Sequence, residues 1–324
     1  MNGKVLLGLL LGFLATASWG SFYIAGRWLY GEEGNTINSW LFNFLRFSMA
    51  AVALLPLLVP KKTRELIFRA FKEDFLEFLI IAATGIVIES SLVFCSLKFT
   101  TAARSSLMAN CSPIATVILA WVMLRQKSSL GAVIGMLIGF AGIVLAAVAK
   151  GGDIYADTGW RTLVGDAMSL ASGIFWAYFT VKGAKVSQKY GGPVCMAVCF
   201  MLGAAMMVPV LFFTVRPADF SALTPRMWGG VLYTGVVTLA LANACWYGAL
   251  RYLKPGVLGA FGYLSAAITF TLSALVLKER FTPPFILAIV LILGGMALMM
   301  RMTPQSEKQE NENKTLSENA ENHL

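Results

Sequence analysis

Long apolar runs alternate with short polar segments along almost the whole chain. Each run has roughly 20 residues, the length that an α-helix needs to cross the hydrocarbon core of a bilayer. The runs predict ten membrane-spanning helices, at 5–25, 37–59, 75–97, 103–124, 130–149, 162–182, 193–214, 227–250, 255–277 and 284–300. The segment 302–324 departs from this pattern because it is polar and lacks aromatic residues, so it predicts a disordered tail.

A stretch of the first half returns in the second half without a gap. The matched pairs, each 153 residues apart, include Lys98 with Arg251, Phe99 with Tyr252, Ser112 with Ser265 and Thr116 with Thr269. Each half holds five spans, an odd number, so the second half must enter the membrane in the opposite direction. The sequence therefore predicts an all-α membrane protein of two inverted five-helix repeats, at 1–149 and 162–301, with a linker at 150–161.

Composition and charge agree with this interpretation. Only 13% of residues are charged, whereas soluble domains carry about 25%. The net charge of +9 comes from basic residues in short loops, which favours positive loops facing the cytoplasm over a nucleic-acid surface. With a cytoplasmic N-terminus, sixteen Lys and Arg residues fall inside and nine outside. This excess predicts that both termini lie in the cytoplasm.

Motifs for several kinds of chemistry are missing from the sequence. It contains no G-x-x-x-x-G-K-[ST] loop, no H-E-x-x-H and no G-x-S-x-G, and its one histidine is His323 in the tail. We therefore expect neither an enzyme nor a metal or cofactor site. Transport driven by a solute gradient, without ATP hydrolysis, is the function class that remains.

Two charged residues lie deep within predicted spans. Arg46 and Glu89 fall at a similar depth in neighbouring antiparallel helices, and a charge at the bilayer centre costs about 2.5–3.5 kcal/mol on insertion scales. The two residues could form a structural ion pair. Alternatively, Glu89 could be a protonatable group that couples proton exchange or substrate binding to transport.

Other candidate residues are polar or aromatic and fall at corresponding depths of the two halves. Ser90, Asn110 and Asn243 could line a cavity between the halves or hold neighbouring helices together. Aromatic surface would come from Trp19, Trp176, Tyr178, Trp246, Tyr247 and Tyr263. We take Trp19, Glu89, Ser90, Asn110, Trp176, Asn243, Tyr247 and Tyr263 as the candidate substrate site. An aromatic pocket with amide groups suits a small organic solute better than an inorganic ion.

Two further features admit a structural explanation. Asp166, about one turn into its helix, complements the positive end of the helix dipole. Gly131, Gly135 and Gly139 form a smooth stripe that suits close packing within the fold, or a homodimer through that face.

These patterns resemble the paired EamA domains of the drug/metabolite transporter superfamily. The resemblance rests on the basic-aromatic turns at 98–99 and 251–252, Ser112-Pro113, the charged turns at 124–127 and 277–280, Trp19-Gly20 and Arg46-Phe47. Two positions depart from it: Ala266 replaces a proline in the second copy, and Arg104 stands where the family usually has a small residue.

The resemblance implies a multi-pass protein of the bacterial inner membrane that moves a small organic metabolite by alternating access. We expect export rather than uptake, and amino acids or related amines as substrates. One alternative is a nucleotide-sugar or organophosphate exchanger, with Lys98 and Arg104 attracting anions to the outer mouth. The other is a membrane assembly protein that transports nothing.

Overall fold

The computed structural model describes residues 3–30, 37–96, 98–100, 102–149, 159–276 and 282–303. Within these ranges the chain is helical and contains no strand. Eight helical segments there are long and apolar enough to cross a membrane, and Pro255–Thr269 adds a shorter apolar helix. Together with the long helix that opens the second half, they make up the ten spans that the apolar runs predict.

The first half contains five membrane spans and one short connecting helix. Its helices are α1 (Gly3–Tyr30), α2 (Ser39–Leu54), α3 (Lys61–Glu73), α4 (Phe75–Ala82), α5 (Glu89–Ser96), α6 (Ala102–Ala109), α7 (Ser112–Leu124) and α8 (Leu130–Ala149). The third span consists of α4 and α5 and the fourth of α6 and α7. The connecting helix α3 lies between the predicted spans 37–59 and 75–97, where the sequence predicted no helix. It forms because Ile67 and Ala70 lie on one face and are buried against the core.

The second half repeats this order. Its helices are α9 (Trp160–Tyr190), α10 (Gly192–Thr214), α11 (Pro217–Ser221), α12 (Pro225–Tyr233), α13 (Ala242–Ala249), α14 (Pro255–Val276) and α15 (Pro283–Met302). Here α12 and α13 form one span. Helix α9 continues eight residues past the predicted end at 182, with Lys185 and Lys189 on its extension.

Both halves contain a π-helical segment at the same place in their third span. It covers Ala83–Ile88 in the first half and Thr234–Leu241 in the second, so the two segments end 153 residues apart. A π turn changes which way the following residues face, and such turns are frequent at functional sites. The segments end directly before Glu89 and before Ala242, and this sets the direction of the next helical turn in each half.

The fourth span is broken in one half only. Helix α6 ends at Ala109 and α7 begins at Ser112, whereas the matching α14 is continuous. Pro113 explains the break because proline lacks an amide hydrogen and its ring clashes with the preceding helical turn. The second copy has Ala266 at this position, and its helix continues.

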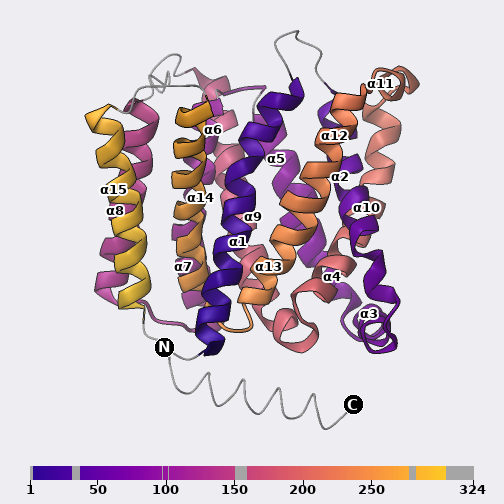
Figure 1. The fold of residues 1–324 in the computed structure, drawn as a ribbon, viewed down its shortest axis with the longest axis horizontal. Helices are drawn as coiled ribbons and strands as arrows, with labels where there is room; N and C mark the ends of the chain where they lie inside the picture. The colour runs from indigo at the N-terminus through magenta and orange to yellow at the C-terminus, as the bar shows by residue number, and fades with distance from the viewer. Residues whose placement is uncertain are drawn as a thin grey trace.

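The two halves have opposite directions in the bundle (Figure 1). Figure 1 places the start of α1 and the connecting helix α3 at one end, called here the lower end. The matching connecting helix of the second half, α11, lies at the opposite, upper end. The halves are therefore inverted relative to each other.

The first helix of each half packs against the other half. A Cβ on Gly8 of α1 would lie 2.8 Å from Tyr252 Cβ, in the turn before α14. Its counterpart Gly165 in α9 would meet Thr100, in the turn before α6, at 2.8 Å from Thr100 Cβ. The same close contact thus occurs at the lower end in one half and at the upper end in the other.

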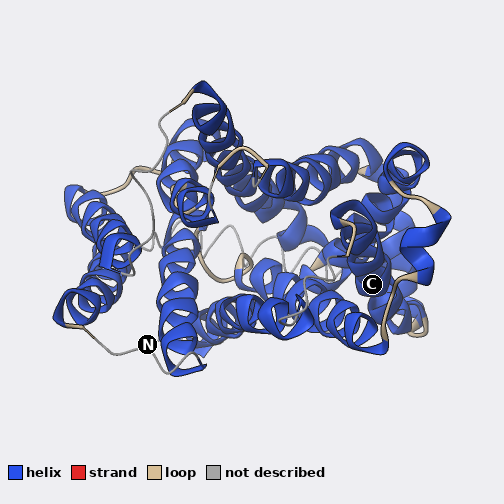
Figure 2. Ribbon diagram, turned by 90° about the horizontal axis from the view of Figure 1, so that it is seen from above, coloured by secondary structure: helices blue, strands red, loops and turns tan. Residues whose placement is uncertain are grey.

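Helices α8 and α15 form a pair at one end of the elongated bundle (Figures 1 and 2). The predicted glycine stripe of α8 lies in this pair, and a Cβ on Gly135 would come within 2.7 Å of the Gly295 carbonyl oxygen. The stripe is therefore used for packing inside the fold. A homodimer stays a prediction and would need a different surface.

Candidate functional site

A cavity of about 280 Å³ lies in the middle of the bundle. Side chains from α1, α2, α5, α6, α7, α9, α13 and α14 line it, so both halves contribute. Its volume is close to the lower limit of known small-molecule sites. Counting 1.5 Å per residue, Arg46, Glu89 and Thr269 lie roughly 10 Å from the upper ends of their helices.

Three tryptophans form one wall of this cavity. The ring centroids of Trp19 and Trp176 are 5.0 Å apart in an edge-to-face arrangement, and Trp246 lies 5.0 Å from Trp19 and 6.0 Å from Trp176. Trp19 Nε1 donates to the Thr238 carbonyl oxygen at 2.9 Å, and Trp246 Nε1 donates to Thr180 Oγ1 at 3.1 Å. These bonds fix both indole rings, so the wall is preorganised.

Two asparagines present hydrogen-bond acceptors to the cavity. Asn110 Nδ2 donates to the Ser106 carbonyl oxygen at 2.8 Å, and Asn243 Nδ2 donates to the Leu239 carbonyl oxygen at 3.0 Å. A carbonyl can accept a bond only from the amide nitrogen, so this geometry assigns the two ends of each carboxamide. Each Oδ1 atom remains as an acceptor on a cavity-lining residue.

The two deep charges line the same cavity. Glu89 accepts a hydrogen bond from Ser90 Oγ at 3.1 Å. Arg46 is only 7% exposed, and its guanidinium carbon lies 4.7 Å from the ring centroid of Phe22 and 5.2 Å from that of Phe42. Cation–π contacts of this kind stabilise a desolvated arginine. A direct ion pair between Arg46 and Glu89 stays a prediction.

The structure brings five of the eight candidate residues to the cavity: Trp19, Glu89, Asn110, Trp176 and Asn243. Ser90 is not among the lining residues, and its Oγ donates to Glu89, which does line the cavity. The lining also includes small polar residues that sequence reasoning did not select, among them Ser106, Ser172, Thr238, Ser265 and Thr269. The spacing of Ser265 and Thr269, one helical turn apart, was a signal that could have identified them.

The two candidate tyrosines do not line the cavity. Tyr247 and Tyr263 are both fully buried, and their hydroxyl groups donate to the carbonyl oxygens of Phe179, at 2.9 Å, and Met136, at 3.0 Å. Each ring occupies space beside a glycine, Gly183 for Tyr247 and Gly139 for Tyr263. Their positions in the structure indicate packing between helices rather than contact with a solute.

Below the cavity, α9 and α13 are joined by buried hydrogen bonds. Besides the bonds made by Trp246 and Tyr247, Ser187 Oγ donates to the Tyr247 carbonyl oxygen. Phe179 and Tyr247 pack with ring centroids 4.8 Å apart. We call this region, made of Phe179, Thr180, Ser187, Trp246 and Tyr247, the α9–α13 closure.

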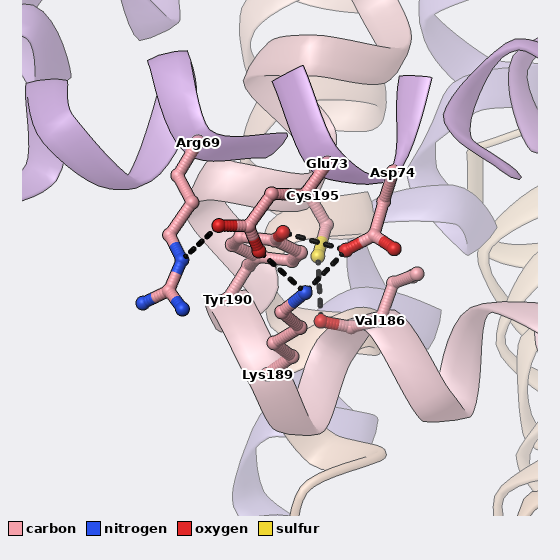
Figure 3. A network of polar contacts seen from close by, with 7 residues as sticks. All are labelled: Arg69, Glu73, Asp74, Val186, Lys189, Tyr190 and Cys195. Carbon is pink, nitrogen blue, oxygen red and sulfur yellow. Dashed lines mark hydrogen bonds and ion pairs between the residues drawn. The ribbon is translucent and has the colours of Figure 1, made fainter. Parts of the chain in front are cut away.

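A network of charged and polar side chains connects the lower ends of α3, α4 and α9 (Figure 3). Lys189 Nζ lies 3.0 Å from Glu73 Oε2 and 2.7 Å from Asp74 Oδ2, and Tyr190 donates to Asp74 Oδ2 at 2.6 Å. Burial alone would raise the pKa of Asp74, but the hydrogen bonds from Lys189 and Tyr190 outweigh it, so the pKa is lowered. Burial and the bond to Asp74 raise the pKa of Tyr190 to about 12.

A separate ion pair lies near the upper end. Arg104 Nε is 3.2 Å from Asp166 Oδ1, and Thr100 Oγ1 donates to the same oxygen at 2.7 Å. Asp166 is thus bound by side chains of the first half, in addition to its favourable place near the start of α9. Because Asp166 faces it, the charge of Arg104 is largely neutralised within the protein.

Comparison with known proteins agrees with the fold and the doubling. The profile of the EamA-like transporter family matches residues 6–148 and again 163–301. A solved structure entitled "Crystal structure of protein" superimposes with a TM-score of 0.77 at 18% identity, over 91% of this chain and 97% of the other, which shows a shared fold.

Relatives come from archaea, bacteria and plants. An uncharacterized transporter of Archaeoglobus fulgidus is 26% identical over 85% of this chain and 92% of its own length. YetK of Bacillus subtilis, an uncharacterized transporter, is 26% identical over 87% and 83%. A WAT1-related protein of Arabidopsis thaliana is 27% identical over 77% and 67%. The chain belongs to the EamA-like transporter family and is a multi-pass membrane transporter.

Proposed function

We propose that this protein is a secondary transporter that exports amino acids or related amines by alternating access, through the central cavity. The observation that carries the proposal is the set of groups on the cavity wall: a carboxylate, two amide oxygens and three tryptophans. All of these attract an organic ammonium group. Export, the inner membrane and cytoplasmic termini follow from the family resemblance and the distribution of basic residues.

The acceptors define how an ammonium would bind. Glu89 supplies a negative charge, and Asn110 and Asn243 supply neutral oxygens from the opposite halves. A protonated amine has three donors and no acceptor, so its needs match this set. The faces of Trp19 and Trp176 add cation–π attraction and apolar surface for a side chain.

Arg46 extends the match to amino acids. Its side chain lines the same cavity and is held between Phe22 and Phe42. A guanidinium group binds a carboxylate through two parallel hydrogen bonds. An α-amino acid would therefore place its carboxylate toward Arg46 and its ammonium toward Glu89, whereas a simple amine would use the second contact alone.

Alternating access requires that the cavity be closed on one side while it opens on the other. The α9–α13 closure supplies a barrier on the lower side, where its five residues are packed and hydrogen-bonded. In the proposed cycle these bonds break when the lower side opens. Helices α9 and α13 both belong to the second half, and their counterparts in the first half are α1 and α5. Inverted-repeat transporters exchange two states by moving one such set of helices against the other.

The anion-exchanger alternative receives less support from the site. Its basis was the positive charge of Lys98 and Arg104, and Asp166 faces Arg104 at hydrogen-bond distance. The cavity itself places a carboxylate, Glu89, among its lining. A phosphate, which carries more negative charge than one carboxylate, would have only Arg46 to offset its repulsion from Glu89.

Thermal stability of the purified protein tests the proposed substrates, because a ligand that binds only the folded state raises the melting temperature. We expect stabilisation by amino acids or by the corresponding amines, and none by their N-acetyl derivatives, which lack the ammonium. The effect should be lost in Asn243→Ala. It should persist in Thr271→Ala, which removes a similar bond to the preceding turn, made to the Ala267 carbonyl oxygen, but does not line the cavity.

Two results would contradict the proposal. One is stabilisation by organophosphates or nucleotide sugars with no response to amines. The other is an equal response to amines in wild type and in Asn243→Ala.

A further inference from the structure

A second hollow lies on the outside of the bundle, between α1, α14 and α15. It has a volume of about 510 Å³ and is lined by Val5, Leu9, Val257, Leu264, Met296, Arg301 and three further apolar residues of α15. Of the described lining residues, Arg301 is the one with a charge. We call this hollow the α1–α15 groove.

The groove faces the hydrocarbon of the membrane. Its neighbours on α1, Leu6 and Leu10, are both 54% exposed, and Val290 of α15 is 59% exposed. Apolar side chains exposed at this depth of a membrane-spanning bundle contact lipid tails. Figure 1 shows α1, α14 and α15 on the same side of the molecule.

The groove runs along the membrane normal and ends at a basic rim. From Arg301 to Leu293 the helical rise is about 12 Å, and all residues between Leu293 and Arg301 that line the groove are apolar. Arg301 lies in the last turn of α15 at the lower end. Lys4 directly precedes Val5 of the lining, and Lys254 directly precedes α14, so two more basic residues stand at this end.

We propose that the α1–α15 groove binds an anionic phospholipid of the lower leaflet. One acyl chain would lie along Leu9, Leu264 and Met296, and the phosphate would bind Arg301. Basic groups next to hollows between membrane helices favour anionic headgroups, and each basic residue near the surface contributes about 1 kcal/mol. The apolar wall holds the chain, and the charge selects the headgroup. This site does not depend on the identity of the transported solute.

Lipid retention measured by native mass spectrometry tests the proposal. The probes are phosphatidylglycerol and phosphatidylcholine with identical acyl chains, added to the full-length protein in detergent. Wild type should retain phosphatidylglycerol preferentially. Arg301→Gln should weaken this retention about fivefold, the factor that corresponds to about 1 kcal/mol for one basic residue. Arg64→Gln, on exposed α3 and away from the groove, should leave it unchanged.

A second variant tests the groove itself. Ala297→Trp places a large ring among the lining residues and should reduce retention of both lipids, whereas Arg301→Gln reduces only the preference for the anionic one. Equal retention of the two lipids by wild type, or equal losses in Arg64→Gln and Arg301→Gln, would overturn the proposal. So would a wild-type dimer that Ala297→Trp converts to a monomer, because a second copy would then occupy the groove.

Discussion

The cavity and the α9–α13 closure share helices α9 and α13, on which they lie one turn apart, and they differ in how their polar groups are used. At the cavity, Trp176 and Asn243 face a hollow, and the Asn243 oxygen is left for a ligand. One turn further, Thr180 and Tyr247 are fully buried and hydrogen-bonded across the helix pair. Asn243 thus presents an acceptor to the cavity, whereas the polar groups of Thr180 and Tyr247 are used inside the protein. Trp246 lies at the boundary, because its ring is part of the cavity wall and its Nε1 donates to Thr180.

Glycine makes the closed region possible. A side chain on Gly183 would overlap the Tyr247 ring, and one on Gly85 would overlap Phe179. Removal of side-chain volume at these two points lets the aromatic rings fill the space between helices. The cavity remains between the tryptophan wall and small residues such as Ser172 and Gly173 of α9, whose side chains do not fill the space.

The largest effect is expected from Gly183→Val. The added side chain must displace Tyr247, and overpacking of a core typically costs about 1–3 kcal/mol or more. Loss of the bond from Tyr247 to Phe179 adds to this cost. We expect little folded protein, measured as the monodisperse fraction in size-exclusion chromatography. Gly294→Ala is the matched control, because nothing lies within 4 Å of its new Cβ. Normal yields from Gly183→Val would show that the closure is loosely packed.

The next effect concerns the cavity. Glu89→Gln keeps the shape of the side chain and removes its charge. A hydrogen bond to a charged group contributes about 1.5–3 kcal/mol, so transport of an amine should fall about tenfold or more. The melting temperature without ligand should change little if Glu89 serves the solute. Glu65→Gln, on an exposed face of α3, is the control.

The same variant decides between the two interpretations of Glu89. A large loss of stability without ligand would assign Glu89 to a structural pair with Arg46, since removal of one partner of a buried pair costs about 3–5 kcal/mol. In that case the loss of transport would follow from misfolding.

A smaller effect is expected from Tyr247→Phe, which removes only the hydroxyl that donates to Phe179. The loss of one hydrogen bond should lower the free energy of unfolding by about 1 kcal/mol. Because the ring remains, the fold should persist. If the closure opens during transport, the variant should also exchange faster between the state that is closed on the lower side and the state that is open there. The measurement is the rate at which a thiol reagent labels a cysteine placed at Phe179. An unchanged labelling rate would argue against opening at this point.

The smallest effect is expected at the network of Glu73, Asp74, Lys189 and Tyr190 at the lower end of the bundle. The pKa of Asp74 is lowered in the folded protein, so its contribution to stability is present above the ordinary pKa of about 3.9 and is lost as the pH falls below it. Between pH 5 and pH 3 the melting temperature of wild type should fall more than that of Asp74→Asn. Parallel curves would show that Lys189 and Tyr190 add nothing at this site.

The periodic features of the sequence predicted much of the fold. Ten apolar runs correspond to ten spans, and the doubled pattern around Ser112 and Ser265 corresponds to the inverted halves. The helix α3 was missed although its signal was present, because Ile67 and Ala70 have helical spacing within a basic segment that resembles a loop.

The site was harder to predict because the direction of a side chain depends on details that hydropathy does not contain. Depth alone identified Glu89 and Asn243, and both line the cavity. Tyr247 lies on the same helix, one turn beyond Asn243, but its side chain points into the closure. The π-helical segment before α13 sets that direction, and no propensity in the sequence marks a π turn.

Counterflow in proteoliposomes tests the central claim most directly, using an amine or amino acid that stabilises the purified protein. Vesicles loaded with the unlabelled solute should accumulate the labelled solute with wild type and with Thr271→Ala, and at least tenfold more slowly with Asn243→Ala. This result would assign transport to the central cavity. Equal rates for wild type and Asn243→Ala, with both proteins folded, would show that the solute takes another path.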